Sequence, residues 1–160
     1  MKTTRSSENT RLLLQMLDEA YQRPTWHGPN LAQSLRGVSA RLAAWRPQPG
    51  RHNIWEVAVH AAYWKYAVRR RLRGEPRASF ALPGSNWFRR PLPGKRGEKA
   101  WAEDRELLAQ EHMRLRAAVA EYLKGAPTER ALRMIFGVAF HDVYHAGQIR
   151  LLRRLKNSDK

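Results

Sequence analysis

Apolar residues recur every three or four positions along four long stretches of this sequence, and little of it shows the alternation of a β-strand. The stretches cover residues 7–22, 53–73, 98–124 and 128–156. Segments rich in proline and glycine separate them. The spacing predicts an all-α fold, most simply a four-helix bundle. A length of 160 residues fits one domain, so we expect residues 1–160 to form a single helical domain.

Two segments between the long stretches are predicted to differ in structure, one with short helices and one as a long connection. Residues 23–52 predict two short helices, the first ending at Gly37 and the second capped by Ser39. Residues 74–99 form a connection long enough to cross the whole bundle, so the helices on either side of it need not be antiparallel. Trp87 and Phe88 in its middle predict that it packs on the bundle, either as a lid over a site or as an oligomer contact.

The second long stretch has a clear start and a clear end. Asn53 is followed three residues later by Glu56, the spacing of a capping box in which each side chain binds the other residue's backbone amide. Gly74 follows the last periodic residues and predicts a glycine cap. We therefore expect a helix that begins after Asn53 and ends before Gly74.

The charge of the chain is strongly positive. Thirty Lys and Arg against fourteen Asp and Glu give a net charge of +16. Such a surplus attracts anions, including nucleic acid, yet no nucleic-acid-binding motif accompanies it. No apolar run has the length of a membrane span, and the N-terminus lacks the apolar core of a signal peptide. We expect a cytoplasmic protein without membrane contact, whose arginines mostly cover solvated helix faces.

A pair of histidines one helical turn apart is the main chemical feature of the sequence. His141 and His145 share an apolar stripe of the last long stretch with Val138, and His60 shares another with Val57 on the second stretch. Buried imidazoles need partners, and a shared divalent metal would supply one. The spacing alone also suits ordinary core histidines.

Several other residues are candidates for the surroundings of such a site. Asp142 and Gln148 are candidates to hold the metal-binding rings, and Trp87 is a candidate pocket wall. Asp142 lies about 100° around the helix from His141, so a water-bridged contact or a role toward a partner helix is an equal alternative for it. The three other histidines are not expected to bind the metal: we expect His27 in a turn, His52 exposed before a helix, and His112 near the bundle interior.

Three segments in this order resemble the DinB/YfiT-like superfamily of metal-dependent enzymes. They are HNIWEVAVHAAYWKYAVRRRL, GSNW in the long connection, and HDVYHAGQI, and the similarity extends over nearly the whole chain. The resemblance implies an up-down-down-up four-helix bundle with its long connection between helices two and three. It also implies that His60, His141 and His145 bind a divalent metal ion, with zinc or nickel favoured and iron as an alternative.

The resemblance also implies an enzymatic function and a partner. Characterised relatives include enzymes that use a low-molecular-weight thiol, so the chain is expected to act on a small molecule as a thiol-dependent S-transferase, or else as a metal-dependent hydrolase. The chain has no cysteine, so a thiol would have to come from the substrate. Relatives are often dimers, and a homodimer is expected here. The alternative is a basic, nucleic-acid-associated or stress-related binding protein in which the metal is structural.

Overall fold

The computed structural model describes residues 2–77, 80–92, 94 and 97–158. Within these ranges the chain forms six α-helices and no strand, so the expectation of an all-α fold is confirmed. The helices are α1 (Lys2–Tyr21), α2 (Leu31–Leu35), α3 (Ala40–Ala44), α4 (Ile54–Leu72), α5 (Glu98–Tyr122) and α6 (Glu129–Ser158). None of these helices combines the length and the hydropathy that crossing a membrane requires.

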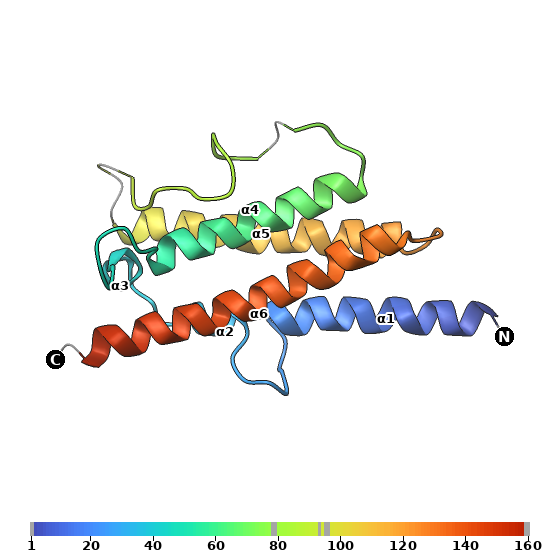
Figure 1. Ribbon diagram of the computed structural model, residues 1–160, viewed down its shortest axis with the longest axis horizontal. Helices are drawn as coiled ribbons and strands as arrows, with labels where there is room; N and C mark the ends of the chain where they lie inside the picture. The colour runs from blue at the N-terminus through green and yellow to red at the C-terminus, as the bar shows by residue number, and fades with distance from the viewer. Residues whose placement is uncertain (1, 78–79, 93, 95–96, 159–160) are drawn as a thin grey trace.

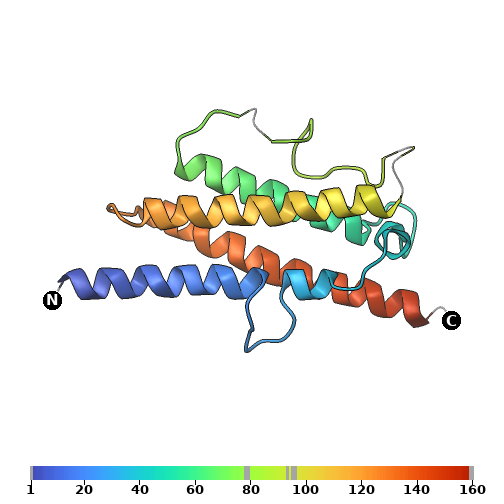
Figure 2. The same cartoon turned by 180° about the vertical axis from the view of Figure 1, so that it is seen from behind.

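The four long helices lie along a common axis, with α4 and α5 pointing one way and α1 and α6 pointing the other (Figure 1). The connection between α4 and α5 returns along the outside of α4, which allows these two consecutive helices to run in the same direction (Figure 2). The arginine-rich end of α4 and the C-terminal end of α6 therefore lie at opposite ends of the molecule.

The boundaries of the helices follow local signals, with two differences. Helix α1 begins at Lys2, five residues before the expected start, because its first residues carry no apolar stripe that the sequence pattern could detect. The expected capping box at the start of α4 is wrong in one half. The Asn53 side chain accepts from the backbone N–H of Glu56, but the Glu56 carboxylate binds Arg46, His52 and the backbone of Arg90 instead.

The core consists of two apolar clusters with a polar layer between them. One cluster surrounds α2, α3 and the first half of α4, and the other surrounds α1, the end of α5 and the start of α6. Between them lie buried polar side chains of three helices: His60 and Lys65 of α4, His112 of α5, and Asp142 and His145 of α6. The predicted metal-binding residues His60 and His145 and the candidate Asp142 therefore all lie in this layer.

Candidate metal centre

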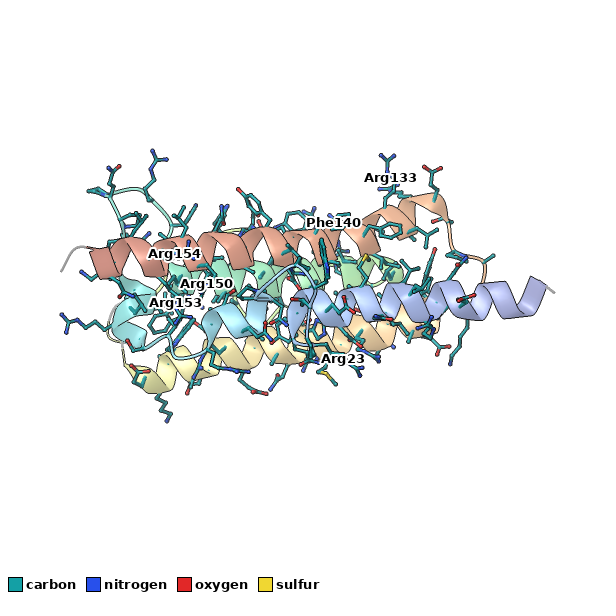
Figure 3. All side chains as sticks on the ribbon, turned by 90° about the horizontal axis from the view of Figure 1, so that it is seen from below. Arg23, Arg133, Phe140, Arg150, Arg153 and Arg154 are labelled. Atoms are coloured by element: carbon teal, nitrogen blue, oxygen red, sulfur yellow. The ribbon has the colours of Figure 1, made fainter. Side chains whose placement is uncertain are left out.

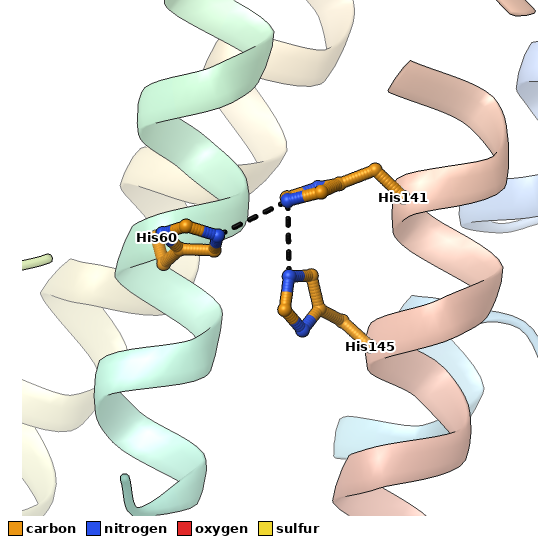
Figure 4. A group of neighbouring side chains, drawn as sticks. All are labelled: His60, His141 and His145. Atoms are coloured by element: carbon orange, nitrogen blue, oxygen red, sulfur yellow. Dashed lines mark hydrogen bonds between the residues drawn. The ribbon is translucent and has the colours of Figure 1, made fainter. Parts of the chain in front are cut away.

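Helices α4 and α6 bring the three predicted histidines together. His60 comes from the middle of α4, and His141 and His145 come from successive turns of α6, with all three rings pointing into the space between the helices (Figure 4). The His141 Nε2 atom lies 3.1 Å from His60 Nε2 and 3.0 Å from His145 Nε2. One nitrogen from each ring lies within 4.8 Å of the others, so the group could hold a metal ion. We call these three residues the histidine cluster.

Hydrogen bonds at the far side of two rings fix which nitrogen carries a proton. The His60 Nδ1–H donates to the backbone carbonyl of Asn86 at 2.8 Å, and the His145 Nδ1–H donates to the Oε1 atom of Gln148 at 2.7 Å. In a neutral ring the Nε2 atom then carries a lone pair. These contacts are the kind that orient metal-binding imidazoles, so Gln148 has the position expected of it.

The nitrogens of the histidine cluster cannot satisfy one another. Two lone pairs face His141 Nε2, which has at most one proton to donate, so at most one of the two short contacts is a hydrogen bond. A buried polar atom without a partner is costly. Ligands about 2.0 Å from one tetrahedral zinc ion lie about 3.3 Å apart, close to the two distances from His141 Nε2 to the other rings. The residues present therefore fit a divalent metal with nitrogen preference.

Burial keeps the cluster uncharged. Desolvation lowers the pKa of His60 to about 4 and that of His141 to about 3; the neighbouring His145 imidazole adds to both shifts, and the hydrogen bond to Asn86 opposes that of His60. Desolvation also lowers the pKa of His145, although its hydrogen bond to Gln148 opposes the shift. Because a metal binds the unprotonated imidazole, the rings are ready for a metal at neutral pH.

The long connection packs on the cluster through Asn86 and Trp87. Asn86 adopts a φ of 65°, and its Oδ1 atom accepts from the Trp64 indole N–H at 3.0 Å. The Trp87 ring stacks on His60 with centroids 3.8 Å apart, and on its other side it stacks on His52 at 3.6 Å. Trp87 thus lies against a ring of the cluster, and His52 is half-exposed beside it. The role of the Asn86 carbonyl could not be predicted from the residue types, because a backbone acceptor is present at every position.

A second buried polar group lies next to the histidine cluster in the polar layer. The ammonium group of Lys65 forms an ion pair with Asp142, and both side chains are fully buried. His112, which is stacked on Tyr21, lies with its Nδ1 atom 3.5 Å from the Lys65 ammonium. Burial lowers the pKa of Lys65 and raises the pKa of Asp142, while the charge of each partner opposes the shift. We call Lys65, Asp142 and His112 the lysine–aspartate cluster.

The lysine–aspartate cluster determines the role of Asp142 and includes one residue, Lys65, that was not expected. Asp142 does not hold a metal-binding ring, because it points to Lys65 across the helix interface. His112 is fully buried but takes no part in the histidine cluster, as expected. His27 is exposed in the loop after α1. Lys65 itself was not anticipated. Its only signal was a lysine between Ala61 and Val68 on an apolar face.

Comparison with sequence models of protein families shows the family to which the chain belongs. The sequence model of the DinB superfamily matches residues 24–149, which include α4, the long connection and the part of α6 that carries His141 and His145. The chain belongs to the DinB superfamily. Comparison with curated proteins and with solved structures finds no match. Membership in the DinB superfamily and the histidine cluster agree with a metal-binding protein of this family.

Proposed function

We propose that this DinB-superfamily chain is a divalent-metal-dependent enzyme whose metal ligands are His60, His141 and His145. The observation that carries the proposal is the convergence of three neutral imidazoles whose Nε2 atoms have no other way to be satisfied together. Zinc and nickel suit a set of imidazole nitrogens, and iron is an alternative. The parallel direction of α4 and α5 supports the up-down-down-up bundle of the family.

A divalent ion held by three imidazoles keeps a coordination position open and lowers the pKa of a thiol or water bound there. The residues of the chain provide the setting for this chemistry. Asn86 and Gln148 hold two rings in position, and Trp87 covers one face of His60 and limits the access of water to it. The chain has no cysteine, so a thiol would be the substrate's own. We propose a thiol S-transferase that uses a low-molecular-weight thiol, with metal-dependent hydrolysis as the alternative reaction.

Metal analysis of matched histidine variants tests the ligand set. The wild-type protein and His27→Ala, which removes an exposed histidine outside the cluster, are expected to purify with about one metal ion per chain. His141→Ala is expected to lose the metal, because it removes the ring that both other Nε2 atoms face. Undiminished metal in His141→Ala would refute the ligand set.

The two reactions are separated by a spectroscopic titration. In the cobalt-substituted protein, addition of a low-molecular-weight thiol is expected to produce the ultraviolet absorption band that arises when sulfur binds cobalt. No band with any thiol at saturating concentration would favour hydrolysis over thiol transfer. The His141→Ala variant is the control, because it is expected to give no band under the same conditions.

The basic alternative, a nucleic-acid-binding protein, depends on the charge alone. Arginines are spread along the face formed by α1 and α6 (Figure 3), and some of them make internal contacts. Arg23 pairs with Asp18, and Arg153 donates to the backbone carbonyls of Ser34 and Arg36. Binding of DNA or RNA that weakens steeply with salt would support this alternative, and a flat titration at low salt would remove it.

A further inference from the structure

An open groove of about 580 Å³ lies directly beside the histidine cluster. Its walls come from the C-terminal half of α6, the segment before α4 and the long connection. Two of its wall residues contact the cluster: Trp87 stacks on His60, and Gln148 accepts from His145. The volume is in the range that holds a small organic molecule. We call this space the metal-side groove.

The walls of the metal-side groove are apolar along most of their length. Leu151 and Leu155 of α6 lie one helical turn apart, and Trp45 lies on the same groove. Both leucines are more than two-fifths exposed, with exposed fractions of 57% and 42%. From Gln148 to Leu155 the helix rises about 10 Å, so the apolar wall extends about that far from the cluster. A ligand here needs an apolar body.

Among the described residues that line this groove, Arg51 is the only cation and none is a carboxylate. The Lys156 ammonium lies 5.3 Å from the ring centre of Trp45 at the groove wall. Arg51 and Arg46 come from the same segment before α4, but their situations differ. Arg46 forms a bidentate ion pair with the Glu56 carboxylate, which neutralises its charge. The Arg51 guanidinium has no carboxylate partner among the described residues. An unpaired guanidinium at the edge of an apolar groove binds a carboxylate, sulfonate or phosphate group well.

A further polar group in the groove is a histidine fixed by a carboxylate. The His52 Nδ1 atom lies 3.0 Å from the Glu56 carboxylate and donates to it. In the neutral ring this leaves the Nε2 atom as an acceptor, and the ring itself is held against Trp87. The groove thus offers an anion-binding donor, one acceptor and an apolar wall.

We propose that the metal-side groove binds a small organic anion with an apolar body, whose anionic group is held by Arg51. The body lies along Leu151 and Leu155, and the other end of the molecule faces the histidine cluster. This inference rests on the proposed function, because it assigns the substrate class of the same metal centre. It assigns amphipathic anions as the class of substrate that this groove binds beside the metal centre.

Two fluorescent probes with the same ring body test the anionic group. One is 8-anilinonaphthalene-1-sulfonate, and the other is the neutral N-phenyl-1-naphthylamine, which lacks the sulfonate. Arg51→Gln is expected to weaken binding of the sulfonate about tenfold or more, since it removes a charge-assisted hydrogen bond, and to leave the neutral probe unchanged. Leu151→Gln is expected to weaken both probes, because it changes the apolar wall.

A matched arginine variant tests whether the probes bind at another place on the protein. A second groove of about 450 Å³ between α1 and the start of α6 has no charged lining residue. Arg133→Gln removes an exposed arginine from that end of α6, and it is expected to change neither probe. An equal loss of both probes in Arg51→Gln, or a response of the sulfonate to Arg133→Gln alone, would overturn the proposal.

The probe titration needs no metal, so its failure is distinct from failure of the metal centre. The His141→Ala variant is expected to keep the response to Arg51→Gln even after it loses its metal. A second measurement tests the position of the ligand. In the cobalt-loaded protein the ¹⁹F signal of 4-(trifluoromethyl)benzoate is expected to broaden strongly relative to the zinc-loaded protein. Equal line widths in the two proteins would place the anion away from the metal and overturn the inference.

Discussion

Two buried polar clusters lie next to each other between α4 and α6, and they are built on opposite principles. The lysine–aspartate cluster contains one cation and one anion, so its charges cancel within the protein. The histidine cluster contains three neutral rings and no carboxylate, so it has neither a cation nor an anion of its own. His141 and Asp142 are adjacent in sequence, yet each belongs to a different cluster.

The difference is the one expected between a structural polar group and the proposed metal-binding site. In a buried ion pair each charge is neutralised by its partner, so removal of one partner leaves a buried charge without compensation. A group of lone pairs is complete only when a cation is added from outside. The neighbouring clusters therefore predict opposite responses to the same kind of substitution, and the following experiments are arranged by the size of the expected effect.

The largest effect is expected from Lys65→Met. It leaves the Asp142 carboxylate buried without its ion-pair partner, which should lower the free energy of unfolding by about 3–5 kcal/mol. Chemical denaturation of the metal-free protein measures this loss. The double variant Lys65→Met/Asp142→Leu should recover most of it, because no charge then remains buried. A single variant as stable as the wild type would contradict the assignment of a structural ion pair.

A smaller effect is expected from Gln148→Leu, and it concerns metal affinity. The substitution removes the acceptor of the His145 Nδ1–H and leaves all three rings in place. Loss of such a contact typically lowers metal affinity about 10- to 100-fold. Competition with a chelator measures the change. Tyr144→Phe is the matched control, since it removes only the hydroxyl that accepts from the Gln148 amide and should cost less.

The pH dependence of metal affinity should be weak between pH 7 and pH 5. An ordinary imidazole, with a pKa of about 6.5, would take up protons in this range and compete with the metal. The pKa of His60 is about 4 and that of His141 about 3, so these two rings should compete only near pH 4, and the pKa of His145 is also lowered by burial. Isothermal titration at several pH values measures it. A steep fall already at pH 6 would show that the rings are not desolvated.

The same pKa values fix the sign of the stability change in the metal-free protein. The histidines have lower pKa values in the folded chain than in the unfolded chain, so the unfolded chain binds more protons between about pH 6.5 and pH 4. The free energy of unfolding should therefore fall as the pH drops through this range. Loss of stability is expected to begin below pH 6.5, and none is expected from these groups above it.

The smallest effect is expected from His141→Leu in the metal-free protein. The substitution replaces a ring whose nitrogens are poorly satisfied by an apolar side chain, so the free energy of unfolding should change by less than about 1 kcal/mol. The same variant should bind no metal. Comparison with Lys65→Met by chemical denaturation gives the sharpest contrast between the clusters. A loss as large as that of Lys65→Met would make the histidine cluster structural.

Local patterns in the sequence predicted much of the helical framework. Helical spacing located the four long helices, and Ser39 and Gly74 marked helix ends that the structure contains. The convergence of His60 with the α6 pair was expected from the family resemblance, since spacing within one helix says nothing about which helices are neighbours. The homodimer and the cytoplasmic location stay predictions.

What the sequence could not predict depends on contacts between distant segments. The Glu56 side chain leaves its expected cap because Arg46, ten residues away, offers a charged partner. For Asp142 the sequence left a contact with a metal-binding ring and a role toward a partner helix equally open, and the structure has the second, with Lys65 of α4 as the partner. The Asn86 carbonyl is a backbone acceptor, and only the path of the connection brings it to His60.

The contacts of the long connection with His60 have a consequence for the affinity of the proposed metal site. The ring is oriented by the Asn86 carbonyl and covered by Trp87, both of which belong to a segment outside the helices. When the histidine cluster holds the proposed metal ion, docking of that segment and binding of the ion are thermodynamically linked, and each changes the other by the same factor. On this proposal, a substitution in the connection that removes no nitrogen ligand would still alter the affinity for the metal.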